Sequence, residues 1–312
     1  MPTLGRLAFL GLAAALVVGG SPASATTYDQ VVVFGDSNVD NGNLAAAAAK
    51  LGIVVNPPPN FGGRNNNGPV VVEYLANDLG IPLQDYAFSG ATTGPGVTSG
   101  LIVNTLSQIT NYLGANGGKA DPNALYVYWA GSNDLLGVGS DANLLSTSIS
   151  GAIANVTTAV NDLGAAGAGT ILVANRTPRT DLTSQDNLNG VALNTALAAA
   201  LPGIDEGVSA SVPLFDDYSL ISDMITDPSK YGFLHTAPTD ICINDPVCST
   251  NLSVASTYVF WDAAHKTTRV HEIMADAIAQ ELGQSVPEPM SLALLLPAGL
   301  VLVVARRRGS SM

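Results

Sequence analysis

The sequence predicts an α/β fold in which helices cover a parallel sheet. Short apolar runs rich in β-branched and aromatic residues alternate with longer helical stretches, which is the order of strand–helix–strand units. The clearest strands are expected at 31–34 (VVVF) and 124–129 (ALYVYW), which are apolar throughout and therefore typical of buried strands. With 312 residues, 47% hydrophobic and 12% charged, the chain is expected to form one large domain, or two at most.

The remaining elements follow from local signals. Strands are expected at 31–34, 84–88, 124–129, 170–174 and 212–215, with a further strand-like segment at 257–261. Helices are expected at 44–51, 72–79, 101–113, 141–163 and 186–200, and a last one ends near 282. Asp141 is expected to cap the long fourth helix. Residues 56–69 are too rich in Pro, Gly and Asn for regular structure, so they predict a surface loop.

The first 25 residues have the layout of a secretory signal peptide. Arg6 precedes the apolar run 7–18, and the segment 23–25 (Ala-Ser-Ala) is a small-residue cleavage site. The chain is therefore expected to be exported, with its folded domain at 26–285. No internal repeat or break in composition divides this domain.

The C-terminal segment combines three features in a fixed order. Residues 287–289 (Pro-Glu-Pro) precede an apolar run at 291–305, and three arginines follow at 306–308. In this order the segment 286–312 resembles the PEP-CTERM sorting signal of Gram-negative bacteria. The resemblance implies cleavage by an exosortase-type membrane protease and delivery to the cell surface or extracellular matrix. Because the run is shorter than the roughly 20 residues of a permanent span, we expect a transient inner-membrane anchor; an ordinary C-terminal anchor is the alternative.

Charge and cysteine content narrow the possible functions. The net charge of −13, without an acidic block, is typical of a solubilising surface and disfavours binding to nucleic acid or anionic membranes. Cys242 and Cys248 lie close together in the sequence. In an exported chain, this spacing predicts a small disulfide loop in preference to a free reactive thiol.

Ser37 is the first candidate for chemistry. The strand at 31–34 runs into Gly35-Asp36-Ser37, so the serine falls at the carboxyl end of a buried strand, where open α/β sheets hold reactive groups. Alone, the segment leaves two interpretations open, a nucleophile or an N-cap of the following helix. A nucleophilic serine also needs a base and an acid that orients this base.

The base must come from three histidines. His265 follows Asp262 by one tight turn, which can bring the carboxylate to the imidazole Nδ1 and leave Nε2 facing the serine. His271 falls in the last predicted helix, where a structural role is expected. His235 lies in a loop, and we assign it no role.

Donors for an oxyanion can come from three strand ends. They are the backbone N–H groups of Ser37 and Gly90 and the side-chain amide of Asn133. Taken singly, Gly90 and Asn133 are ordinary turn residues. Because all three follow predicted strands, the pattern favours one shared site.

Four blocks of residues carry these candidates. The blocks are 34–37 (FGDS) with Asp40 and Asn43, then Gly90, 131–134 (GSND) and 262–265 (DAAH), with supporting similarity at 63–75, 87–92 and 260–261. In order and spacing they resemble the GDSL, or SGNH, family of esterases and lipases, over residues 31 to about 282. The resemblance implies a three-layer α/β/α sandwich with a mainly parallel sheet of about five strands, and no metal or cofactor. It also implies roles for the candidates: nucleophile Ser37, general base and acid His265, orienting acid Asp262, and oxyanion hole Ser37, Gly90 and Asn133.

One position next to the site departs from the family pattern. Subfamilies with this last block usually carry proline after the histidine, where this chain has Lys266. Two possibilities stay open: a cation that lowers the pKa of the neighbouring imidazolium, or a side chain that points to solvent.

Other site chemistries fit the sequence poorly. No mid-chain Gly-x-Ser-x-Gly supports a common α/β-hydrolase. The segment 36–47 lacks the glycine and glutamate of an EF-hand, and HExxH is absent. His265 and His271 would lie on different helix faces, which disfavours zinc, and 90–96 lacks the dinucleotide fingerprint.

We therefore expect an exported serine esterase or lipase that hydrolyses carboxylic esters through an acyl-enzyme. Lipids, short-chain esters and acetylated extracellular polysaccharide all remain open as substrates. A rival of another class is a catalytically silent surface or matrix protein that uses the fold to bind carbohydrate. The enzyme is favoured because every catalytic-type position retains a competent residue.

Overall fold

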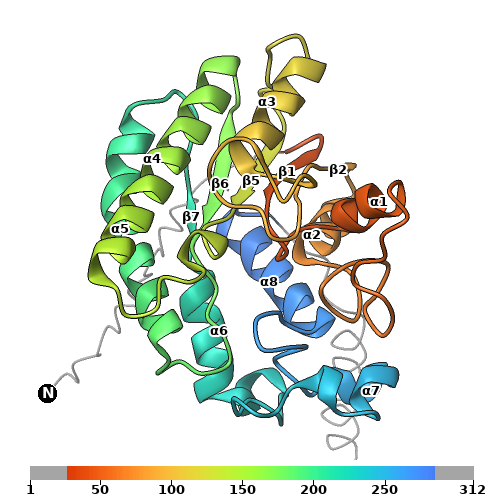
Figure 1. The fold of residues 1–312 in the computed structure, drawn as a ribbon. Coiled ribbons are helices and arrows are strands. Elements are labelled where there is room, and N and C mark those ends of the chain that lie inside the picture. Colours follow the sequence, from red (N-terminus) through yellow and green to blue (C-terminus); the bar gives the residue numbers. More distant parts are fainter. Residues whose placement is uncertain (1–26, 285–312) are drawn as a thin grey trace, which may run out of the picture.

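A five-stranded parallel sheet forms the middle of the computed structural model, which describes residues 27–284 (Figure 1). The strand order is β2-β1-β5-β6-β7, and every pairing is parallel. The strands are β1 (Val31–Gly35), β2 (Leu83–Asp85), β5 (Leu125–Trp129), β6 (Thr170–Ala174) and β7 (Leu214–Phe215). The expected three-layer α/β/α sandwich with about five strands is confirmed.

Helices cover both faces of this sheet because its strands are apolar on both sides. One face packs against α2 (Val71–Leu79), α6 (Asp217–Thr226) and α8 (Thr268–Glu281). The other packs against α3 (Thr105–Ala115), α4 (Ala142–Ala166) and α5 (Gln185–Glu206). The alternation is visible in β1, where Val31 and Val33 enter the first core and Val32 and Phe34 the second.

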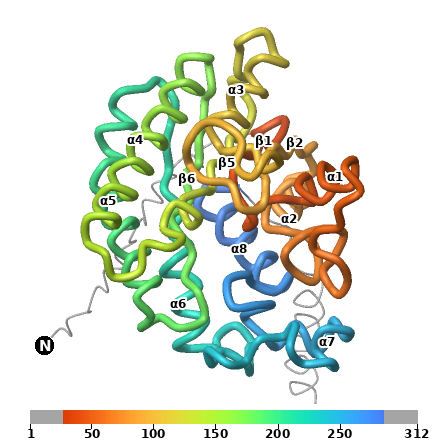
Figure 2. Tube along the Cα trace, viewed as in Figure 1, coloured from red at the N-terminus to blue at the C-terminus, as the bar shows by residue number. Residues whose placement is uncertain are grey.

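The N-terminal and C-terminal parts of the described chain pack against each other through α2 and α8. Figure 2 traces the chain from red β1 to blue α8, and α8 packs beside α2 on one face of the sheet. The hydroxyl groups of Tyr74 and Thr268 are 2.8 Å apart across this helix pair. The turn after β1 and the loop before α8 are thereby brought to the same edge of the sheet.

Two local predictions hold and one is wrong. Asp141 caps α4 as expected, since its carboxylate accepts from the backbone N–H groups of Asn143 and Leu144. The prediction that residues 56–69 lack regular structure is also confirmed. The alternative role of Ser37 as a helix cap is wrong, because α1 (Asn43–Ala49) begins after Gly42, whose φ of 116° suits glycine.

The structure also corrects two predicted elements. Residues 257–261 form no strand of the sheet: Val259 N–H donates to the His235 carbonyl, and Thr267 N–H donates to Val259. Helix α3 begins later than predicted because a small hairpin of β3 (Val97–Thr98) and β4 (Ile102–Val103) precedes it. The structure adds the short elements η1 (Asn133–Leu135), η2 (Pro228–Tyr231), η3 (Cys242–Asn244), η4 (Cys248–Thr250) and α7 (Leu252–Ala255).

The expected disulfide joins Cys242 to Cys248 in the loop before α7. Both cysteines are buried and pack against Trp261, so the bridge supports the segment that leads to His265. The predicted signal peptide and C-terminal tail lie outside the described residues. Within 27–284, no helix combines the length and the apolar character needed to cross a membrane.

Candidate active site

The turn after β1 presents Ser37 at the edge of the sheet. Gly35 is required there, since a Cβ at this position would lie 2.4 Å from the Trp129 carbonyl oxygen. The buried amide of Gln108 accepts from Gly35 N–H (2.8 Å) and donates to its carbonyl (2.9 Å). Gln108 was not singled out in the sequence, because nothing in a helix pattern shows that one side chain will fasten a distant strand end.

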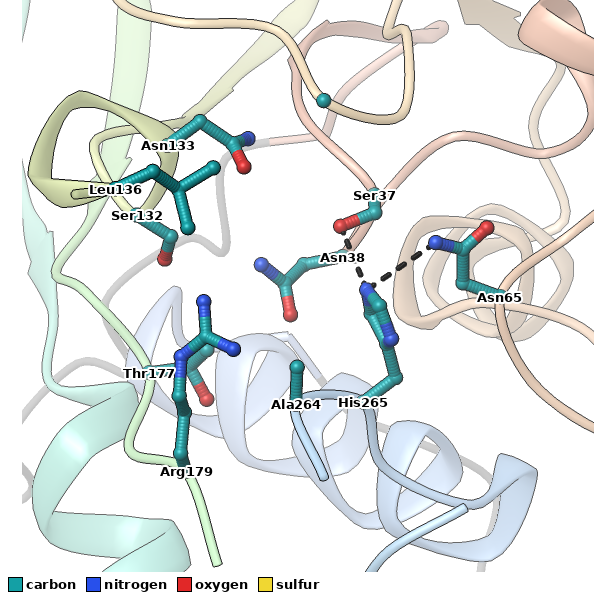
Figure 3. Close-up of a pocket in the computed structure, with 11 residues that line it drawn as sticks. Ser37, Asn38, Asn65, Ser132, Asn133, Leu136, Thr177, Arg179, Ala264 and His265 are labelled. Carbon is teal, nitrogen blue, oxygen red and sulfur yellow. Dashed lines mark hydrogen bonds between the residues drawn. The ribbon is translucent and has the colours of Figure 1, made fainter. Parts of the chain in front are cut away.

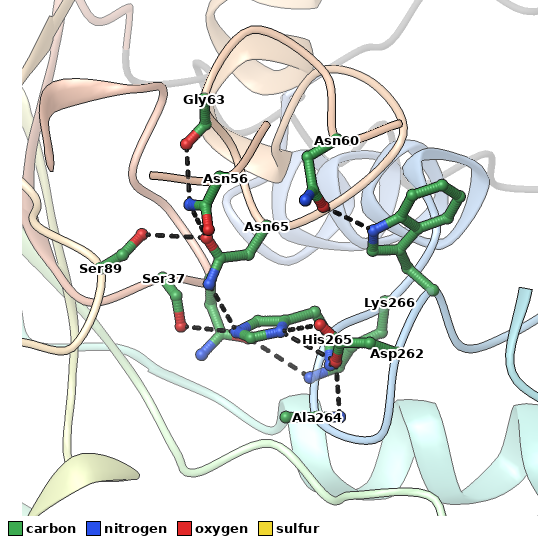
Figure 4. Close-up of polar contacts among 12 residues, drawn as sticks. Ser37, Asn56, Asn60, Gly63, Asn65, Ser89, Asp262, Ala264, His265 and Lys266 are labelled. Carbon is green, nitrogen blue, oxygen red and sulfur yellow. Dashed lines mark hydrogen bonds and ion pairs between the residues drawn. The ribbon is translucent and has the colours of Figure 1, made fainter. Parts of the chain in front are cut away.

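Ser37, His265 and Asp262 are hydrogen-bonded in series. The Ser37 Oγ lies 2.8 Å from the His265 Nε2, and the His265 Nδ1 lies 2.8 Å and 2.9 Å from the two Asp262 carboxylate oxygens. Figure 4 shows the imidazole between the other two side chains. The structure thus brings Ser37 next to His265, 228 residues further along the chain, and its neighbour Asp262.

The turn 262–265 holds the carboxylate in place. Asp262 Oδ1 accepts from the backbone N–H groups of Ala264 (2.7 Å) and His265 (2.8 Å). Burial raises the pKa of Asp262, but the hydrogen bonds from His265 and the two amides outweigh this effect, so the pKa falls below its ordinary value. An ionised Asp262 fixes the tautomer with the proton on Nδ1, which leaves Nε2 free to accept.

Asn65 is a site residue that sequence reasoning missed. Its Nδ2 lies 3.2 Å from His265 Nε2, on the same nitrogen that faces Ser37 (Figure 4). Its Oδ1 accepts from Ser89 (3.4 Å) and from Asn56, so the amide is oriented. With the Nδ1 proton directed at Asp262, Nε2 is the nitrogen that can accept, and the Asn65 amide lies beside it. Residues 63–75 carried supporting similarity to the family, but nothing in the irregular loop 56–69 indicated which distant group Asn65 would face.

The motif residues Asp40 and Asn43 position the Gly90 loop. Asp40 accepts from both the backbone N–H (2.7 Å) and the hydroxyl (2.8 Å) of Ser89. Asn43 donates to the carbonyls of Asp85 and Ala87, at the end of β2. Gly90 itself has φ 87°, a conformation that favours glycine.

Gly90 and Asn133 share one cavity with Ser37 and His265 (Figure 3). The cavity has a volume of ≈ 210 Å³. Asn133 Nδ2 donates to the Ala91 carbonyl (2.9 Å), which ties η1 to the Gly90 loop. All five predicted site residues are therefore gathered at one place, with Asp262 behind the imidazole.

Lys266 lies beneath this cavity and not in solvent. Its side chain is fully buried, and its Nζ donates to Asn38 Oδ1 at 3.3 Å. Burial lowers the pKa of Lys266 to about 8, while nearby Asp217 and Asp36 raise it in part. Of the two possibilities that the sequence left open, the solvent-facing one is wrong.

The other two histidines lie outside the serine contact. His271 is buried in α8, where its Nδ1 accepts from Val71 N–H at 3.2 Å, consistent with the expected structural role. Burial lowers the pKa of His271 to about 3. His235 stacks on Tyr258 with ring centroids 3.9 Å apart.

Among the described residues, no group of three or more His, Cys, Asp or Glu side chains could hold a metal ion.

A serine, a histidine and an aspartate linked in series at the carboxyl edge of a parallel sheet form the arrangement used by serine hydrolases. Comparison with known proteins is more specific. Residues 31–278 match the family described as GDSL-like Lipase/Acylhydrolase. The match spans most of the chain, and the protein belongs to this family.

Curated relatives are distant and often longer. The thermolabile hemolysin of Vibrio parahaemolyticus is 24% identical over 283 residues, covering 81% of this chain and 63% of the relative. The phosphatidylcholine-sterol acyltransferase of Aeromonas hydrophila is 26% identical over 73% of this chain and 69% of its own length. A GDSL esterase/lipase of Arabidopsis thaliana, APG, is 30% identical over 30% of each chain. The chain thus spans less than two thirds of the hemolysin and of APG.

Solved structures share the fold at low sequence identity. A catalytic mutant of Axe2, an acetylxylan esterase from Geobacillus stearothermophilus, matches with a TM-score of 0.50 and 14% identity. The match covers 84% of this chain and 97% of that chain. At this identity, the likeness concerns the fold alone.

The buried Lys266 predicts a pH dependence of stability. Its pKa of about 8 in the folded state lies below the ordinary 10.5, so the unfolded state binds more protons between these values. The free energy of unfolding should therefore rise with pH from 8 to 10.5, relative to Lys266→Met, by up to about 3 kcal/mol. Urea unfolding across this range measures the difference. The exposed Lys119→Met is the control and should follow the wild type; parallel curves for wild type and Lys266→Met would contradict the prediction.

Proposed function

We propose that this member of the family hydrolyses carboxylic esters, with Ser37 as nucleophile and His265 as general base and acid. The observation that carries the proposal is the 2.8 Å contact between Ser37 Oγ and His265 Nε2, with Asp262 on the opposite ring nitrogen. A serine hydroxyl is a weak nucleophile until a base takes its proton, and the neutral imidazole is oriented to do so.

The reaction follows from these contacts in two halves. Ser37 Oγ attacks the ester carbonyl while its proton passes to His265 Nε2, and Asp262 stabilises the resulting imidazolium. The imidazolium then protonates the departing alcohol, which leaves an acyl group on Ser37. Water attacks this acyl-enzyme with His265 again as the base, and release of the acid restores the serine.

The oxyanion is stabilised by N–H groups around the cavity. The proposed donors are the backbone amides of Ser37 and Gly90 and the side-chain amide of Asn133. One N–H of the Asn133 side-chain amide donates to the Ala91 carbonyl, and the second N–H can face the developing charge on the substrate oxygen. A volume of ≈ 210 Å³ favours a short acyl group, because pockets for drug-sized ligands usually exceed about 300 Å³.

We also propose that the protein is exported and sorted to the cell surface. The support is in the sequence: the signal-peptide layout of 1–25, and the Pro-Glu-Pro motif, apolar run and arginine cluster within 286–312. A disulfide between Cys242 and Cys248 fits an oxidising compartment.

Replacement of the nucleophile tests the proposed mechanism directly. Ser37→Ala should abolish turnover of p-nitrophenyl acetate and labelling by a fluorophosphonate, since no other group can form the acyl-enzyme. Thermal melting should be unchanged, because Ser37 lies in a turn outside both hydrophobic cores. Turnover at the wild-type rate in the variant would exclude this mechanism.

Asn133 tests the oxyanion hole. Asn133→Ala should lower kcat for p-nitrophenyl acetate by about 10²–10³-fold, the usual cost of losing one oxyanion donor. The exposed Asn143→Ala is the matched control and should retain wild-type kcat. A loss of only a few-fold in Asn133→Ala, with normal melting, would remove this amide from the hole.

Processing of the tail tests the proposed sorting. In the native host, intact mass of the surface-associated protein should lack residues 1–25 and the segment around 286–312. Replacement of Pro287, Glu288 and Pro289 by alanine should leave the tail attached, because the protease would lose its recognition motif. A surface protein with the complete tail would instead indicate a permanent anchor.

A further inference from the structure

The cavity beside Ser37 contains one permanently charged side chain, Arg179. No Asp or Glu is among its lining residues, although the chain has 25 acidic residues and 12 basic ones. In Figure 3, Arg179 and His265 lie on either side of Asn38. A group bound next to the nucleophile therefore meets a guanidinium in an otherwise acidic protein.

The structure holds Arg179 firmly in this position. The buried Asn187 accepts from the backbone N–H of Arg179 at 2.9 Å and donates to its carbonyl at 3.1 Å. Asp186 binds the guanidinium from one side, with 2.8 Å between its Oδ2 and the Arg179 Nε. Both the backbone and the inner end of the side chain are fixed, so binding a ligand there costs little conformational entropy.

The outer end of the guanidinium makes no hydrogen bond. Within residues 27–284, neither Nη1 nor Nη2 of Arg179 donates to another residue, and the guanidinium pairs with Asp186 through Nε. Asp186 is shared, because the buried Arg176 pairs with the same carboxylate oxygen. The carboxylates of Asp36 and Asp217 are fully buried beneath the cavity and cannot meet an incoming ligand.

Arg179 also lies between the cavity beside Ser37 and a second hollow on the surface. A second hollow, of ≈ 450 Å³, shares Arg179 and Leu136 with the first and extends along Gly137, Gly139 and Asn189. Asp186 also lines this hollow, and its carboxylate is already paired with Arg176 and Arg179. A substrate whose ester carbonyl lies at Ser37 can pass the guanidinium on its way into this second hollow. The free nitrogens are thus placed beside the part of the substrate remote from the scissile bond.

We propose that Arg179 binds an anionic group, a carboxylate or a phosphate, carried by the ester substrate. The two free nitrogens can donate side by side to two oxygens of such a group, the geometry in which arginine binds oxyanions best. The inference rests on the proposed function, since it assigns the substrate class of the same site. It makes Arg179 a specificity-determining residue for esters with a charged substituent.

Matched esters test the preference for an anion. The substrates are 4-acetoxybenzoate, 4-acetoxyphenyl phosphate and the neutral 4-acetoxybenzamide, which all lose the same acetyl group. Arg179→Gln should lower kcat/KM for at least one anionic ester by about 10–100-fold, and for the amide by less than threefold. The ratio of kcat/KM for an anionic ester to kcat/KM for 4-acetoxybenzamide is compared between the wild type and Arg179→Gln, so that differences in the intrinsic reactivity of the esters cancel. The two anionic esters distinguish a carboxylate site from a phosphate site.

Three controls separate the possible causes. Arg179→Lys should recover part of the preference, while Lys119→Gln, which removes an exposed positive charge, should keep the wild-type ratio. Benzoate or phenyl phosphate should also inhibit hydrolysis of the acetyl ester of 4-acetoxybenzamide by the wild type more strongly than benzamide does. This advantage should shrink in about 0.5 M NaCl, which screens the charge.

The outcomes are distinct for the two proposals. Three results would overturn the role of Arg179. They are an unchanged ratio of kcat/KM in Arg179→Gln, an equal loss of kcat/KM for all esters, and equal inhibition by the anions and by benzamide. Failure of the wild type to hydrolyse any of the esters faster than Ser37→Ala would instead overturn the proposed function.

Discussion

Two hydrogen bonds between the beginning and the end of the folded chain hold the site together. Ser37 contacts His265, and the next residue in each segment repeats the contact, since Asn38 accepts from Lys266. Both pairs are separated by 228 residues. The position of β1 as an inner strand makes this possible: its carboxyl end lies between those of β2 and β5, beside the loop that precedes α8.

The ionisable groups around the site differ in their surroundings. Asp262 is held ionised by His265 and two backbone amides, and it can therefore stabilise an imidazolium. Burial raises the pKa of Asp217 to about 6 and lowers that of Lys266 to about 8, so both groups stay mostly charged at pH 7 and their opposite charges partly offset each other below the cavity. The guanidinium of Arg179, in contrast, keeps its charge and reaches the cavity itself. A guanidinium is thus placed where a ligand can reach it.

The sequence was most informative where one local pattern determines the outcome. The apolar runs at 31–34 and 124–129 predicted the two central strands, and Asp141 predicted the start of α4, because these signals depend on neighbouring residues. The family blocks indicated which side chains would gather. The segment 257–261 was misread because its apolar residues are buried, as in a strand, while its backbone pairs with the loops around His235 and Thr267. The pattern of apolar residues in a sequence indicates which side chains are buried, but it does not indicate which segment the backbone will pair with.

Asn65 and Arg179 could not be predicted for a related reason. Both lie in irregular segments, and what matters is the distant group that each one faces: the imidazole of His265 for Asn65, and the cavity for Arg179. Such contacts depend on how loops pack onto a completed sheet. Sequence patterns within a loop carry little information about them.

The position of α8 determines when, during synthesis of the chain, the site can form. The loop that carries Asp262 and His265 is fixed by the last helix of the described chain, which packs on α2. A chain interrupted before this helix contains every strand of the sheet and His265 itself, but lacks the packing that holds their loop next to Ser37. Reactivity toward esters is therefore expected only after almost the whole domain has been synthesised.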